Sequence, residues 1–112
     1  MPGELTFSSS SLDVKSNFYE VLDSVSKVLK EYDKTDIFIS GHTDNTGKDS
    51  YNMILSQDRA ESVAKYLKSR GVQEDRIKSE GLGSQYPISS NSTSKGREDN
   101  RRVEIEIVAQ KG

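Results

Sequence analysis

Residues 37–47 read IFISGHTDNTG, and the rest of the chain can be placed around this stretch. Its first three residues are apolar and mostly β-branched, which predicts a short strand buried on both faces. The polar residues between Gly41 and Gly47 predict a loop. Because ligands of open α/β sheets bind where strands end and helices begin, this loop is the first candidate for a binding site.

A helix is predicted on each side of this strand and loop. Before the strand, apolar residues recur at spacings of three and four, the period of one helix face. The residues of this face are Phe18, Val21, Leu22, Val25, Val28, Leu29 and Tyr32, with Ser16 or Asn17 as the N-cap. The second helix is predicted from Asp49 or Ser50 to Arg70, with Gly71 as its C-terminal cap after two cationic residues. Its apolar face comprises Leu55, Ala60, Val63, Ala64 and Leu67.

Three further strands complete the predicted sheet. Residues 4–7, followed by a polar turn at 8–11, and residues 77–82 are extended candidates, and residues 83–99 predict a long polar loop. In residues 103–107, Val and Ile alternate with Glu, as in a strand with one solvated face. The order predicts an α+β fold (a βαβαββ α/β sandwich), a small mixed four-stranded sheet with two main helices on one face. The strand–helix–strand unit is expected to be a right-handed parallel crossover, and the last strand to be antiparallel to its neighbour.

Composition limits the kind of protein that the chain forms. Its 112 residues fit one domain, predicted over 1–112 with a core of about 5–108. Charged residues make up 30% of the chain but the net charge is only -2, which argues against nucleic acid as a partner. There is no cysteine and no run of 18 apolar residues, so neither thiolate chemistry nor a membrane span is predicted. The N-terminus has no signal-peptide pattern, and we expect a domain excised from a longer protein.

The predicted loop carries one carboxylate, Asp44, and Arg59 follows it in the early half of the second helix. Leu55 precedes Arg59 by one helical turn, so Arg59 is expected near the edge of the core. An acid beside an Arg fork suits a zwitterion, because the acid takes an ammonium and the guanidinium takes a carboxylate in bidentate fashion. On spacing alone, a structural salt bridge between the two residues is the alternative.

The sequence gives no support for catalysis. His42 is the only histidine and has no clear nucleophile partner, so hydrolysis is unsupported. His42 with Asp44 and Asp49 is a poor metal site, and we expect His42 to pack or to form a hydrogen bond at the end of the strand. No catalytic residue, metal ligand or cofactor is therefore predicted.

A long ordered series of motifs resembles the OmpA-like C-terminal domain, which is shared by outer-membrane proteins, peptidoglycan-associated lipoprotein and the flagellar stator protein MotB. The resemblance runs from about residue 5 to residue 108. The motifs are Gly41 to Gly47, Tyr51-Asn52, Leu55-Ser56, Arg59-Ala60, Ser62-Val63, Gly71-Val72, Arg76-Ile77, Glu80 to Gly83, Pro87-Ile88, Asn91 to Thr93, Gly96-Arg97 and Asn100 to Ile105.

This resemblance implies non-covalent binding of peptidoglycan through meso-diaminopimelate of the stem peptide. The ligand-binding residues that it implies are Thr43, Asp44, Asn52, Leu55, Arg59, Asn100 and Arg101. One departure is Ser8, where many relatives have an Asp. It removes a carboxylate near the site and puts in doubt the role of the first loop in holding the ligand ammonium.

The resemblance also implies a place in the cell and a set of partners. We expect a domain in the periplasm of a Gram-negative bacterium that tethers the outer membrane or a membrane protein to the cell wall. The membrane would be reached only through a segment absent from this chain, such as a barrel, a lipid anchor or an inner-membrane helix. The alternative function is a protein-interaction or homodimerisation domain of stator or envelope-assembly type, with weak or no wall binding.

Overall fold

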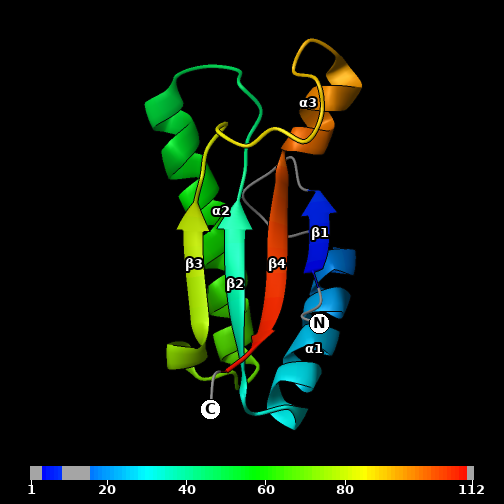
Figure 1. Cartoon of the computed structure of the whole chain (residues 1–112), viewed down its shortest axis with the longest axis vertical. Coiled ribbons are helices and arrows are strands. Elements are labelled where there is room, and N and C mark those ends of the chain that lie inside the picture. The colour runs from blue at the N-terminus through cyan, green and yellow to red at the C-terminus, as the bar shows by residue number, and fades with distance from the viewer. Residues whose placement is uncertain (1–3, 9–15, 111–112) are drawn as a thin grey trace.

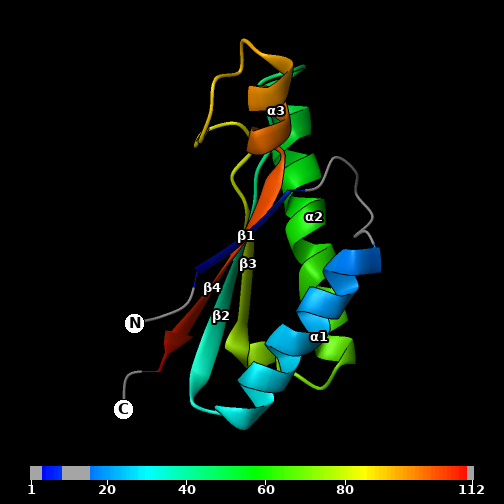
Figure 2. The same cartoon turned by 90° about the vertical axis from the view of Figure 1, so that its right-hand side faces the viewer.

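The computed structural model describes residues 4–8 and 16–110 and has a helix layer on one face of a sheet (Figures 1 and 2). Its elements are β1 (Glu4–Ser8), α1 (Ser16–Glu31), β2 (Thr35–Gly41), α2 (Asp49–Ser69), a 3-10 helix (Glu74–Arg76), β3 (Ile77–Gly81), α3 (Ser94–Asn100) and β4 (Arg102–Ala109). From Ser9 onward, the turn predicted at residues 8–11 lies outside the described residues. The side chains of Ser16 and Asn17, the predicted N-cap candidates, lie outside them too. No helix in the described part of the chain has the length and apolar character that crossing a membrane requires.

The sheet is mixed and its four strands run in the order β1-β4-β2-β3. β2 and β3, joined through α2, are parallel, with Ile37 opposite Ile77. β4 lies between β2 and β1 and is antiparallel to both. The α+β fold, the parallel strand–helix–strand unit and the antiparallel last strand are thus confirmed.

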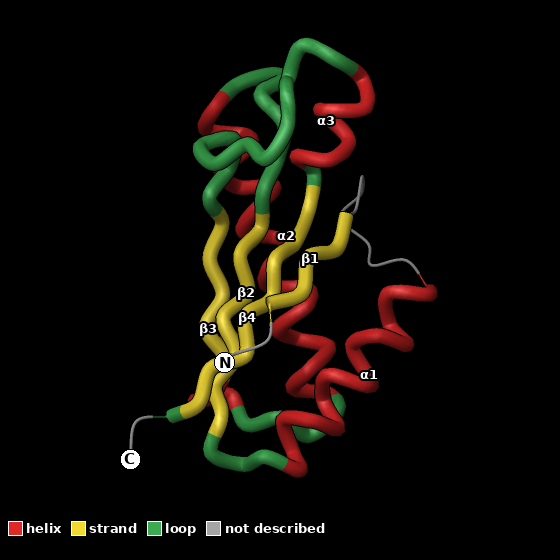
Figure 3. The backbone as a smooth tube through the Cα atoms, turned by 45° about the vertical axis from the view of Figure 1, so that its right-hand side comes forward, coloured by secondary structure: helices red, strands yellow, loops and turns green. Residues whose placement is uncertain are grey.

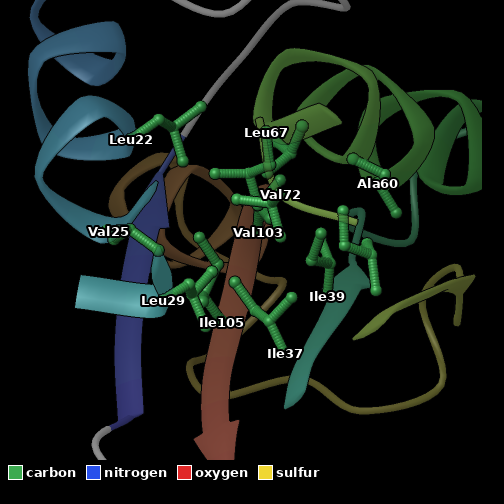
Figure 4. Packing of buried hydrophobic residues seen from close by; sticks show 13 residues of the cluster. Leu22, Val25, Leu29, Ile37, Ile39, Ala60, Leu67, Val72, Val103 and Ile105 are labelled. Carbon is green, nitrogen blue, oxygen red and sulfur yellow. The ribbon is translucent and has the colours of Figure 1, made fainter. Parts of the chain in front are cut away.

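The core lies between the sheet and the two long helices (Figure 4). It is formed by Leu22, Val25, Leu29, Ile37, Ile39, Ala60, Val63, Ala64, Leu67, Val72, Ile77, Val103 and Ile105. Among the described side chains of the predicted α1 face, Val28 is 41% exposed and Tyr32 is 61% exposed, and Val21 is partly buried and packs against the core. The side chain of Phe18 lies outside the described part of the chain. Val28 is on the margin of the buried stripe, and Tyr32 follows the end of the helix at Glu31.

The prediction that β2 is buried on both faces is wrong. Ile37 and Ile39 are buried against the helices, but Phe38 between them is 43% exposed. Both α1 and α2 cover the same face of the sheet (Figure 2), so alternate side chains of β2 point to a face that no described helix covers.

The ends of the two long helices are fixed by specific contacts. Gly71, with φ of 93°, follows α2 and donates its N–H to Lys68 O, while Val72 N–H reaches Leu67 O. This pair of bonds is a Schellman motif, so the predicted glycine cap is confirmed. Arg76 donates to Leu29 O, Tyr32 O and Thr35 O, and so binds carbonyls at and beyond the end of α1.

The predicted loop at 83–99 is not entirely irregular, because it ends in α3 (Figure 3). The Thr93 side chain caps this helix by accepting the Gly96 N–H at 2.9 Å. The helix has seven residues and no large apolar side chain, so no hydrophobic period announces it.

Candidate functional site

The loop after β2 is fixed to its neighbours by backbone hydrogen bonds. His42 N–H donates to Arg102 O and Thr43 N–H donates to Gly83 O, each at 2.9 Å. His42, Thr43 and Asp44 are all buried. The loop therefore joins the segments that follow β3 and precede β4, all at the end of the sheet where β2 and β3 finish.

Asp44 is held by bonds to both of its carboxylate oxygens. Oδ1 accepts the Thr46 N–H at 2.8 Å, and Oδ2 accepts from Arg101 Nη1 at 2.7 Å. Burial acts to raise the pKa of Asp44, but the bonds from Thr46 and Arg101 outweigh it and hold this pKa below its ordinary value. Asp44 is therefore ionised at neutral pH.

Asn52 fixes the same loop to α2. Its Nδ2 donates to Thr46 O at 3.1 Å and to Asp44 O at 3.4 Å. Leu55 lies nearly one turn further along α2 and is half-buried. Thr43 turns its hydroxyl to Asp44 O at 2.8 Å. The structure thus brings Thr43 and Asn52 into contact with the backbone of Asp44.

Arg59 is buried without a carboxylate partner. It is only 3% exposed, and its one hydrogen bond to a described residue runs from Nη1 to His42 O at 3.1 Å. Its Nε is buried and has no partner among the described residues. Burial lowers the pKa of Arg59, the charge of Arg101 lowers it further, and Asp44 opposes the shift. The predicted position at the core edge is confirmed.

The alternative that Asp44 and Arg59 form a structural salt bridge is contradicted. Asp44 makes its ion pair with Arg101, and Arg59 is in no ion pair with a described residue. Sequence reasoning did not anticipate this pairing, because 57 positions separate the two residues and only the tertiary fold brings them together. In this site the Asp44 carboxylate is paired with Arg101, whereas the buried guanidinium of Arg59 has no ion-pair partner among the described residues.

Asn100, Arg101 and Arg102 have three different positions. The Asn100 amide accepts the N–H groups of Ile88 and Ser89 and donates to Ser89 O and Asn91 Oδ1, so it holds the loop before α3. Arg101 reaches Asp44, as described above. Arg102 is buried and donates to Glu104 Oε2, Tyr86 O and Asn100 O, which directs it away from Asp44.

His42 packs at the end of β2, as expected, but it does not form a side-chain hydrogen bond. Neither ring nitrogen has a partner among the described residues, and Nε2 lies 3.7 Å from Glu104 Oε1. The ring is edge-on to Tyr86 at 6.5 Å between centroids. Burial, with help from the charge of Arg102 and against that of Glu104, lowers the pKa of His42 to about 4. Within the described ranges no three acidic, His or Cys side chains are grouped to hold a metal ion.

Comparison with known proteins gives one consistent family. The model of the OmpA family matches residues 6–101. The chain is 50% identical over 107 residues to the probable lipoprotein YiaD of Escherichia coli, covering 96% of this chain and 49% of that protein. It is 44% identical over 105 residues to the peptidoglycan-binding protein ArfA of Mycobacterium tuberculosis, covering 94% of this chain and 32% of that protein. The chain thus spans about half or less of these relatives.

Solved structures agree with the sequence comparisons. The peptidoglycan-associated lipoprotein of Burkholderia pseudomallei has a TM-score of 0.87 at 27% identity, covering 91% of this chain and 88% of that one. The cell wall anchor of the type VI secretion system of Pseudomonas aeruginosa has a TM-score of 0.82 at 31% identity, covering 97% and 82% respectively. The range that the family model matches, residues 6–101, includes both Asp44 and Arg59.

Proposed function

This chain belongs to the OmpA family, and we propose that it binds peptidoglycan non-covalently and catalyses no reaction. Support comes from relatives whose names state that they bind or associate with peptidoglycan or anchor to the cell wall. Relatives described as a lipoprotein and as outer membrane proteins support an envelope location, and we place the domain in the periplasm of a Gram-negative bacterium. In a longer protein, it would tether the membrane-attached part to the wall.

The ligand group that we propose is meso-diaminopimelate, and Arg59 carries the argument. A buried charge without a partner is costly, and a ligand carboxylate would compensate it. Among the described residues, the Nε of Arg59 has no partner and its Nη1 donates only to a backbone carbonyl, which leaves donors of the guanidinium for a bidentate pair.

Asp44 supplies the opposite charge in this proposal. A carboxylate accepts about four hydrogen bonds, and Asp44 accepts two from described residues. A ligand ammonium would take the remaining positions while Arg101 keeps the carboxylate oriented. Thr43, Asn52 and Asn100 then act mainly by fixing the loops, because their hydrogen bonds run to backbone and side-chain groups of those loops. Leu55 would contact the apolar chain of the ligand.

An NMR titration of the ¹⁵N-labelled protein with meso-diaminopimelate tests this proposal. Saturable shifts are expected at residues 43–47 and around Arg59, Asn100 and Arg101. Nα-acetyl-L-lysine amide is the matched control, because it keeps the carbon chain and the terminal ammonium but has no free carboxylate. Equal shifts with both compounds, or none with meso-diaminopimelate and none with soluble wall fragments, would refute the site.

The homodimer expected as an alternative is tested separately by sedimentation equilibrium. A mass that stays at 12.5 kDa over a hundredfold concentration range would dismiss it.

A further inference from the structure

The face of the sheet that α1 and α2 do not cover has a strongly biased composition. Two cross-strand rows form it, Lys78–Phe38–Glu106 and Glu80–Ser40–Glu104, and we call these six residues the open face. It carries three carboxylates, one ammonium and an exposed aromatic ring. Its three carboxylates outnumber its one ammonium, and the Arg102 guanidinium, which is bonded to Glu104, offsets part of this excess, so the open face is weakly negative beside Phe38.

Phe38 lies between two hollows in this face. One of about 330 Å³ is lined by Phe38 and Ser40 with Lys78 and Glu80 of β3. The other, of about 280 Å³, is lined by the same two β2 residues with Glu104 and Glu106 of β4. Each hollow therefore combines an apolar wall with at least one carboxylate, which suits a long cationic side chain with an aliphatic stem.

A second observation concerns Glu104 and His42 beside these hollows, which keep atoms without a hydrogen-bond partner among the described residues. The Oε2 of Glu104 accepts a hydrogen bond from Arg102, but its Oε1 accepts none from a described residue. His42 lies 3.7 Å from that oxygen, 2% exposed, with both ring nitrogens unpartnered among the described residues. A bound donor next to Glu104 would satisfy the carboxylate.

We propose that the open face binds an extended, cationic segment of a partner protein. Its Lys or Arg side chains would enter the hollows beside Glu80, Glu104 and Glu106, and an apolar side chain between them would cover Phe38. A guanidinium over the face of an aromatic ring adds a cation–π contribution.

Other occupants fit the open face less well. A second copy of this chain would bring a face with the same excess of carboxylates, so the two faces would repel each other overall. A nucleic acid would meet the same repulsion from its phosphates. A metal ion is disfavoured because the described side chains form no group of three acidic, His or Cys ligands.

The test uses an acetylated and amidated peptide, Arg-Ser-Leu-Ser-Arg, titrated into the ¹⁵N-labelled protein. When extended, its Arg and Leu side chains share one side, spaced about 7 Å apart. Saturable shifts are expected at Phe38, Ser40, Glu80 and Glu106, while the amides of residues 43–47 stay unchanged. A peptide with Glu in place of both Arg residues is the ligand control.

Paired variants separate a specific site from general charge attraction. Glu80→Gln with Glu106→Gln should weaken binding of the Arg peptide about fivefold. Glu20→Gln with Glu31→Gln changes the net charge equally at exposed positions of α1 and should leave the affinity within about twofold. No saturable shifts on the open face, equal binding of the Glu peptide, or equal weakening in both double variants would overturn the proposal. If the Glu80→Gln, Glu106→Gln variant still shows the chemical shift changes with meso-diaminopimelate, its weaker binding of the Arg peptide does not come from a loss of the wall-binding site.

Discussion

Arg59→Met should make the protein more stable while abolishing ligand binding. Arg59 is 3% exposed and donates only one hydrogen bond to a described residue, so folding removes its charge from water with little compensation. The variant loses the bond to His42 O, which costs about 1 kcal/mol. It also removes a desolvation penalty of several kcal/mol and places an apolar side chain of similar length in a buried site.

The net expectation is a gain of about 2 kcal/mol in the free energy of unfolding, or about 8 °C in Tm for a domain of this size. Urea and thermal unfolding without ligand measure the gain, and titration with meso-diaminopimelate measures the loss of binding. A loss of stability larger than about 1 kcal/mol would show that Arg59 is structural, and the reasoning from an unpaired charge would fail.

Arg76→Met is the matched control, since Arg76 is similarly buried at 7% exposure. Unlike Arg59, it donates to three backbone carbonyls and to Thr35 Oγ1. Its removal leaves those acceptors without a donor and should cost about 3 kcal/mol. The two substitutions should therefore change stability in opposite directions.

Three further outcomes follow from the site and the sheet. The unfolded chain binds a proton at His42 more tightly than the folded protein does, so acidification from pH 6.5 to 4 should remove up to about 3 kcal/mol of stability. In urea unfolding at pH 4.5 and 7.5, His42→Leu should reduce the difference in the free energy of unfolding between the two pH values. Folding lowers the pKa of Asp44, so the contribution of Asp44 to stability is present above its unfolded pKa and is lost as pH falls through its folded pKa. A carboxyl ¹³C titration should find Asp44 ionised at a pH where exposed Asp residues are half-protonated. Gly41→Ala should lower the free energy of unfolding by more than about 2 kcal/mol in chemical denaturation, because a Cβ there would collide with the backbone of Ser56 on α2. Unchanged stability would contradict the close packing of β2 against α2.

α1 was predictable because its apolar residues recur with a strong helical period. α2 is less amphipathic, but Gly71, two residues after its end at Ser69, has a positive φ that allows the Schellman motif and marked its end. The alternation in β4 predicted which of its faces is buried. Residue types, spacing and the family resemblance also led to the prediction that Asp44 and Arg59 bind one ligand, which stays a prediction.

The features that sequence did not predict depend on tertiary contacts or on weak local signals. A run of three apolar residues does not show which faces of a strand are covered. The exposure of Phe38 follows from the position of both long helices on the opposite face of the sheet. The partner of Asp44 is far away in sequence, and α3 is short and polar with Gly96 within it.

The antiparallel pairing of β1 with β4 determines how the domain would carry a mechanical load. Glu4 begins β1 opposite Glu106 and Ser8 ends it opposite Arg102, so β1 runs toward the end of the sheet where the loop that contains Asp44 lies (Figure 1). If the site is held by the wall and a connected segment pulls on β1 from its N-terminal side, the force runs along the strands. All the β1–β4 hydrogen bonds are then sheared together and share the load, whereas peeling would break them one after another. A tether attached there would resist rupture better than one attached across the strand direction.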